Sequence, residues 1–219
     1  MMKYIAHRGA SKRYIENTYK AFKYAFESSF DGCECDIRIT RDYAFIVYHD
    51  KDLLRLNNSK QQIKDLNLVD IQQYVYSDGQ EMLTLQQLLE LQSQFKKILL
   101  IEIKDELTRN EMESLNRMLQ QVDLKFIKII SFHLYIINYF RQYVDVMYLN
   151  NELSKNEIMN LKKLEIYSVN LNVEFFRNST HLKYIQSNLY VSYWTVDDVS
   201  MQQILQEEKV EFLTTNIVD

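Results

Sequence analysis

Acidic residues in two separate stretches of the chain are spaced so that their side chains can share one face. Glu34 and Asp36 have a single residue between them, and so do Glu102 and Lys104. In a β-strand, residues two apart point to the same side. Three carboxylates brought together in this way repel one another unless a cation lies between them. Carboxylate oxygens suit Mg²⁺ or Ca²⁺, so the spacing predicts a site for one divalent cation.

Two histidines lie beside other charged residues, His7 before Arg8 and His49 before Asp50. An imidazole titrates near neutral pH and can serve as a general acid or base. Arg8 offers phosphate oxygens a planar fork, and Lys104 offers them a point charge. With a bound cation, these groups could hold a phosphate diester between two proton carriers and stabilise its developing negative charge.

Short apolar runs alternate with stretches of helical periodicity along the chain. We expect strands at residues 3–8, 32–40, 97–103, 126–131, 144–149, 165–171, 189–195 and 210–214, with a further short extended piece at 45–49. We expect helices at 11–29, 84–95, 110–121, 133–142, 155–163, 173–188 and 198–207. Strands separated by helices imply parallel crossovers, so the pattern predicts an α/β protein, a (β/α)8 TIM barrel. A doubly wound open sheet is the structural rival.

The candidate residues fall near the carboxyl ends of these strands, where barrel enzymes place their sites. Each pattern has an ordinary alternative, because Glu-x-Asp is often a solvated face and Glu102 with Lys104 could form a surface ion pair. The other face of the second strand, however, carries Cys33, Cys35 and Ile37, which indicates packing against helices. Its carboxylates must then point into the barrel, where buried charges need partners.

Composition narrows the class of protein. The 219 residues are 47% hydrophobic, which suits one domain over residues 1–219 with a packed core. The net charge of −4 argues against a nucleic-acid partner. We expect no membrane span, because no apolar run approaches about 20 residues, and no signal peptide. Two cysteines read as free thiols, which favours a cytoplasmic protein.

Several motifs, in order, resemble those of the glycerophosphodiester phosphodiesterase family. The resemblance spans essentially the whole chain. It rests on His7-Arg8-Gly9 with Glu16-Asn17-Thr18, Gly32-Cys33-Glu34-Cys35-Asp36-Ile37, Val47-Tyr48-His49-Asp50 with Leu54-Arg55, Leu83-Thr84-Leu85, Ile101-Glu102-Ile103-Lys104, Ser131-Phe132, Trp194-Thr195-Val196 and the stretch from Phe212 to Asn216.

The resemblance implies a barrel with a short insertion after the second strand, at about residues 52–81. It implies hydrolysis of small-molecule glycerophosphodiesters to glycerol 3-phosphate and an alcohol, within lipid and glycerol metabolism. The roles it implies are metal ligands at Glu34, Asp36 and Glu102, general acid and base at His7 and His49, and phosphate binding at Arg8 and Lys104. Trp194 could form an aromatic wall for the substrate or part of the core. The chain departs from the family pattern at Ile15, Tyr43, Leu83 and Asn216, where proline, glycine, proline and aspartate respectively are common.

Other interpretations stay open at this point. A lysophospholipase D or sphingomyelinase D-like enzyme would share the acidic and histidine residues, and a barrel could bind a phosphate ligand without turnover. His133 is expected to flank a helix, and His181 to be packed or solvated. The alcohol, the preferred metal, the acid and base assignment, the attacking nucleophile and the choice between monomer and homodimer are not determined by the residues.

Overall fold

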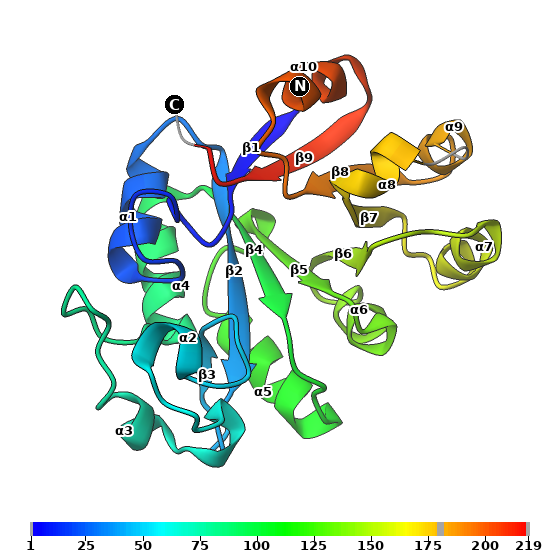
Figure 1. Cartoon of the computed structure of the whole chain (residues 1–219). Coiled ribbons are helices and arrows are strands. Elements are labelled where there is room, and N and C mark those ends of the chain that lie inside the picture. The colour runs from blue at the N-terminus through cyan, green and yellow to red at the C-terminus, as the bar shows by residue number, and fades with distance from the viewer. Residues whose placement is uncertain (1, 179–181, 218–219) are drawn as a thin grey trace.

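Hydrogen bonding between the strands closes the sheet on itself in the computed structural model, which describes residues 2–178 and 182–217. Neighbouring strands pair in parallel, and β1 contacts both β9 and β2 (Figure 1). The barrel strands are β1 (Lys3–Ala6), β2 (Gly32–Ile39), β4 (Ile98–Ile103), β5 (Ile127–Ser131), β6 (Asp145–Asn150), β7 (Ser168–Asn172), β8 (Tyr190–Trp194) and β9 (Val210–Thr215). The predicted (β/α)8 TIM barrel is confirmed, and the open-sheet rival is wrong.

Helices connect the strands and cover the outside of the barrel. They are α1 (Tyr19–Glu27), α4 (Leu85–Phe95), α5 (Arg109–Leu119), α6 (Leu134–Phe140), α7 (Lys155–Lys163), α8 (Val173–Asn178), α9 (Leu182–Gln186) and α10 (Val199–Glu207), with a 3₁₀ turn η2 (Leu124–Phe126) before β5. Thr84, Thr108 and Ser154 each form a capping box at a helix N-terminus, which satisfies backbone N–H groups that the helix leaves unpaired.

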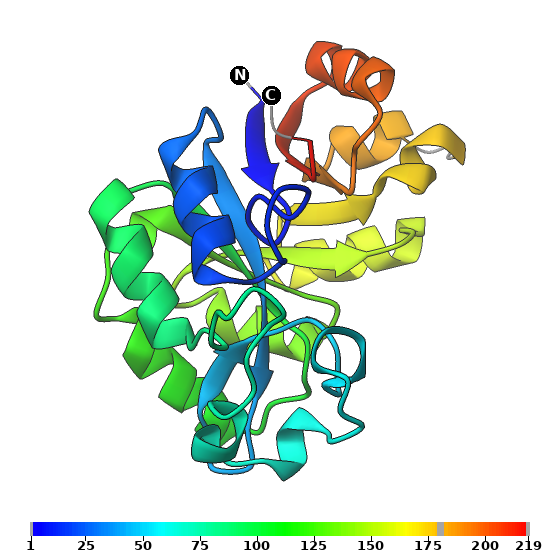
Figure 2. The same ribbon diagram turned by 60° about the vertical axis from the view of Figure 1, so that its left-hand side comes forward.

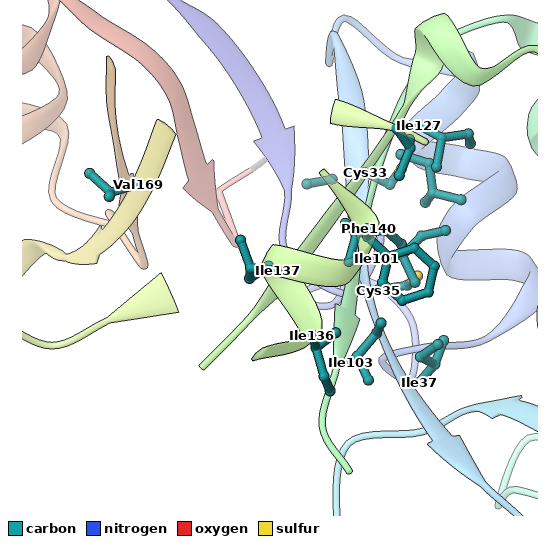
Figure 3. Close-up of a cluster of buried hydrophobic side chains, with 14 of the residues drawn as sticks. Cys33, Cys35, Ile37, Ile101, Ile103, Ile127, Ile136, Ile137, Phe140 and Val169 are labelled. Atoms are coloured by element: carbon teal, nitrogen blue, oxygen red, sulfur yellow. The ribbon is translucent and has the colours of Figure 1, made fainter. Parts of the chain in front are cut away.

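Apolar side chains form two layers, one inside the barrel and one between the strands and the helices. The inner cluster consists of Ile5, Leu100, Ile130, Met147, Leu149 and Phe212. The outer cluster is much larger and includes Cys33, Cys35 and Ile37 of β2 together with Phe140 of α6 (Figure 3). Because strand side chains alternate, the outward position of these three residues turns Glu34 and Asp36 inward, as the sequence predicts.

A short segment after β2 forms a lobe with its own small core. The strand β3 (Phe45–Val47) pairs antiparallel with the end of β2, and α2 (Leu54–Asn57), η1 (Ile63–Asp65) and α3 (Leu68–Ile71) follow it. Figures 1 and 2 show this segment in cyan at the lower end of β2. Its buried cluster includes Ile46, Tyr48, Leu53, Ile63, Leu66, Ile71, Tyr76 and Met82. Of these elements, α2, η1 and α3 lie within residues 52–81, where the insertion is expected, and β3 precedes it.

The first connection differs from its prediction, because the helix expected at 11–29 begins only at Tyr19. Residues before it form turns, with Arg8 at φ 56° and Asn17 at φ 58°. Thr18 caps α1 by accepting a hydrogen bond from the backbone N–H of Ala21. The turn at Tyr43 has φ 65°, a left-handed conformation that suits the glycine common in the family.

Gly9 and Gly79 form a matched pair for testing the close approach of this loop to α1. Both have positive φ, at 73° and 79°, but a Cβ on Gly9 would lie 2.8 Å from the backbone of Ala21, whereas nothing lies within 4 Å of one on Gly79. Gly79→Ala should cost about 1 kcal/mol through backbone strain alone. Gly9→Ala should cost about 1–3 kcal/mol more through overpacking, measured by urea denaturation. Equal losses would contradict the packing argument.

Candidate active site

Strand register brings the three acidic residues together at the mouth of the barrel. In the pairing of β2 with β4, Asp36 lies directly opposite Glu102. Glu34 precedes Asp36 by two residues on the same face. Ligand oxygens of Glu34, Asp36 and Glu102 all lie within 4.8 Å of one another. The structure therefore brings together the three carboxylates that the spacing predicted would converge.

Crowding and burial separate the pKa values of these carboxyl groups. Burial, followed by the neighbouring Asp36 and Glu102, raises the pKa of Glu34 well above its usual range. Burial and then Asp36 raise the pKa of Glu102 to about 7. Burial alone would also raise the pKa of Asp36, but Arg8 and Lys104 outweigh it and hold that pKa below its usual range. Asp36 is thus ionised at neutral pH, and further positive charge would favour the ionised forms of Glu34 and Glu102.

Two cations contact the acidic cluster directly. The Nε atom of Arg8 lies 3.1 Å from an oxygen of Asp36, and its backbone N–H donates to Glu34 at 3.0 Å. The Nζ atom of Lys104 lies 2.7 Å from Glu102 and 3.6 Å from Asp36. Both of the positions expected to bind phosphate therefore lie in the site, where their positive charge faces the carboxylates.

His7 lies beside the acidic cluster because β1 runs next to β2. Its Nε2 atom is 3.9 Å from an oxygen of Glu34. On the other side of the ring, Nδ1 is 2.8 Å from the side-chain oxygen of Asn216. Burial, and then the charge of Arg8, lower the pKa of His7, which favours a neutral imidazole.

His49 approaches the site from the end of the β3 segment. Its Nδ1 atom is 2.6 Å from a carboxylate oxygen of Asp50, whose other oxygen accepts from Arg55 at 2.6 Å. Arg55 also donates to Glu16, which pairs with Arg8 at 2.9 Å. Burial lowers the pKa of His49 despite the opposing effect of Asp36. A chain of charged groups thus links His49 to Arg8.

Trp194 lies half-buried at the end of β8. Its indole N–H donates to the carbonyl of Asn170 at 3.3 Å, and its ring meets Phe132 edge-on at 5.8 Å. These contacts fix the indole at the barrel mouth. His133 lines a cavity next to Lys104. His181 lies outside the described residues.

Several residues beyond the candidate ligands, proton carriers and phosphate-binding positions support the site. The side chain of Asn17 donates to Asp36 at 2.9 Å, and Glu16 and Arg55 join the charged chain. All three occur in the family motifs quoted above, so the motifs mark them, although spacing alone does not reveal their contacts. Asp197 belongs to none of these sequence motifs, yet its carboxylate accepts two hydrogen bonds from Asn216.

The donor set fits a divalent cation. Glu34 Oε1 is buried and has no hydrogen-bond partner among the described residues. Leaving a buried carboxylate oxygen unpaired is costly, and a cation would satisfy it. All three candidate ligands offer oxygen atoms, the type that Mg²⁺ and Ca²⁺ prefer.

In the presence of a chelator, Glu102→Gln should reveal how much ionisation of Glu102 lowers the free energy of unfolding. The raised pKa of Glu102 means that the folded protein binds more protons than the unfolded chain, so this stabilising contribution is present below about pH 4.5 and is lost as pH rises through about 7. Glutamine cannot ionise. Urea denaturation in EDTA should therefore show the variant gaining about 1–3 kcal/mol on the wild type between pH 5 and 8. A pH-independent difference would contradict this account.

Comparison with known proteins places these features in a family. A curated glycerophosphodiester phosphodiesterase from Bacillus altitudinis is 33% identical over 117 residues, which cover 50% of this chain and 48% of the relative. The matched segment thus spans about half the length of that relative. A solved glycerophosphodiester phosphodiesterase from Parabacteroides distasonis is 26% identical, with a TM-score of 0.85 over 98% of this chain and 92% of that one.

A third similarity concerns the fold. An Oleispira antarctica phosphodiesterase, solved in complex with the product sn-glycerol-3-phosphate, has a TM-score of 0.88 at 18% identity and covers 98% of this chain and 92% of its own. The Glycerophosphoryl diester phosphodiesterase family matches this sequence over residues 7–219. Together with the barrel and the acidic cluster at its mouth, this match shows that the chain belongs to the glycerophosphoryl diester phosphodiesterase family.

Proposed function

We propose that this chain hydrolyses glycerophosphodiesters to glycerol 3-phosphate and an alcohol, using one divalent cation, Mg²⁺ or Ca²⁺, held by Glu34, Asp36 and Glu102. The observation that carries the proposal is the cluster of carboxylate oxygens within 4.8 Å of one another, with His7 beside it. Family membership and the named relatives support the same reaction class.

The proposed chemistry divides between charge stabilisation and proton transfer. A bound cation would supply a Lewis acid for the phosphoryl oxygens. Arg8 and Lys104 add positive charge where the transition state becomes more negative, and their contacts with Asp36 hold them in place. His7 and His49 act as the two proton carriers. Each has its Nδ1 atom tied to a fixed partner, which leaves Nε2 for the reacting groups.

A cavity beside Lys104 offers a place for the alcohol portion of the substrate. Its volume is about 390 Å³, and its lining combines the apolar side chains of Ile39 and Ile63 with the ionisable side chains of Arg38, Lys51, Lys64, Asp105, Glu106 and His133. The charged groups in this lining suit a hydroxylated or charged alcohol, which supports glycerophosphodiesters as substrates. We assign Trp194 and Phe132, at the barrel mouth, to the wall that contacts the glycerol portion.

A panel of glycerophosphodiesters with different alcohols, with coupled detection of glycerol 3-phosphate, tests the proposed function. We expect turnover of at least one member with Mg²⁺ or Ca²⁺, loss of turnover in EDTA, and recovery when the cation is returned. Cleavage of lysophosphatidylcholine in preference to glycerophosphocholine would favour the lysophospholipase D interpretation. Binding without turnover across the panel would favour a ligand-binding barrel. Full activity in chelator would contradict the metal role.

Replacing either proton carrier should slow the reaction. His7→Ala and His49→Ala should each lower kcat by about 10²–10⁴-fold, the usual contribution of general acid–base catalysis. Thermal unfolding of both variants should show that the fold is retained, and calorimetric titration with Mg²⁺ should show that cation binding persists. Rates close to wild type in both variants would remove these histidines from the mechanism.

The site does not test the cellular location or the oligomeric state, and both stay predictions. No helix within residues 2–178 and 182–217 has the length and apolar character needed to cross a membrane. A cytoplasmic location and a monomeric or homodimeric state are expected from the sequence. Size-exclusion chromatography with light scattering would test the oligomeric state.

A further inference from the structure

The closure of the barrel brings the first and last strands together at His7. Ala6 lies opposite Thr215 in the pairing of β1 with β9, and the backbone N–H of His7 donates to the carbonyl of Thr215 at 2.9 Å. The next residue on β9 is Asn216. Its side-chain oxygen lies 2.8 Å from Nδ1 of His7 and also accepts from the hydroxyl of Ser11 at 2.9 Å.

The orientation of the Asn216 amide is determined by Asp197, which follows β8. One oxygen of Asp197 accepts from the backbone N–H of Asn216 at 2.7 Å and from Thr215 at 3.0 Å. The other accepts from the side-chain Nδ2 at 2.8 Å. Burial would raise the pKa of Asp197, but the hydrogen bonds from Asn216 outweigh it and lower that pKa, so the group is an ionised carboxylate.

An ionised carboxylate can only accept hydrogen bonds, so the Asn216 amide must present its NH₂ group to Asp197. The amide oxygen then faces His7 and can only accept as well. The proton that completes this contact must therefore lie on Nδ1 of His7. Consequently Nε2, on the side of Glu34, keeps its lone pair when the ring is neutral.

We propose that Asn216, held by Asp197, is a positioning residue that fixes His7 as the Nδ1–H tautomer and directs Nε2 toward the acidic cluster. The proposal rests on the proposed function for its catalytic consequence, because a base needs an unprotonated nitrogen in reach of the substrate. The two histidines differ in this respect, since the Nδ1 partner of His49 is the carboxylate of Asp50, whereas that of His7 is a neutral amide.

Four variants test this arrangement. Asn216→Leu removes the acceptor. Asp197→Asn removes the charge that orients the amide. The double variant Asn216→Asp/Asp197→Asn exchanges the two groups, so that an acceptor again faces His7 and an NH₂ group again bridges the pair. Asn188→Leu serves as the control, because the side chain of Asn188 bonds to Tyr184, Ser187 and Lys162 instead.

The expected kinetic result is a selective loss of kcat. Asn216→Leu should lower kcat by about 10–100-fold while KM stays near the wild-type value, because loss of a partner that orients an active-site group usually has this effect. The exchanged pair should recover most of kcat, and Asn188→Leu should match the wild type. A loss in Asn216→Leu that the exchanged pair does not recover, or no loss at all, overturns the positioning role.

The tautomer is read directly by ¹⁵N NMR of histidine-labelled protein in EDTA at pH 8, with His7→Ala identifying the signals. The wild type and the exchanged pair should show a protonated Nδ1 and an unprotonated Nε2 in His7, whereas Asn216→Leu should shift the proton toward Nε2. A wild-type ring protonated on Nε2 overturns the proposal. Since this readout needs no substrate, failure of the proposed function would appear as an inactive panel with the tautomer result unaffected. If Asn216→Leu does not fold, Asp197→Asn and the exchanged pair provide the same comparison.

Discussion

The mutual repulsion of buried carboxylates is the constraint around which the mouth of this barrel is organised. The register of β2 against β4 sets Asp36 opposite Glu102, and alternation along β2 adds Glu34 to the same face. None of these side chains can turn away, since the opposite face of each strand packs against helices. Their repulsion must therefore be offset by nearby positive charge, which Arg8, Lys104 and a cation suited to their oxygens would supply.

The surrounding elements can be understood as supports for that charge cluster. Arg8 holds a left-handed backbone conformation, and Gly9 after it lets the loop lie close against α1. The lobe after β2 contributes Asp50 and Arg55, which connect His49 with Glu16 and so with Arg8. Because several charged groups share these contacts, displacement of one alters the field at the others. The lobe and the barrel are thus coupled through electrostatics as well as through packing.

Much of this arrangement follows from the sequence, and the reason is periodicity. The alternation of Cys33, Cys35 and Ile37 with Glu34 and Asp36 shows which way the second strand faces, and motif order supports the barrel. Contacts between distant loops leave no such periodic signal. The spacing within 11–29 suggested one long helix, whereas capping at Thr18 starts it later. The pairing of Asn216 with Asp197 depends on the adjacency of two strand ends, which single-sequence spacing does not encode.

The seam between β1 and β9 has a consequence for how the protein is made. Strands leave the ribosome in order, so β1 emerges first and its partner β9 emerges last. Until then the nascent sheet presents open edges to other chains, a state prone to aggregation. The three acidic residues can assemble once β4 has emerged, but His7 gains its amide neighbour only after β9 has followed. A chain in which β9 has not yet emerged therefore leaves one edge of β1 open to mispairing, and its His7 still lacks the Asn216 partner.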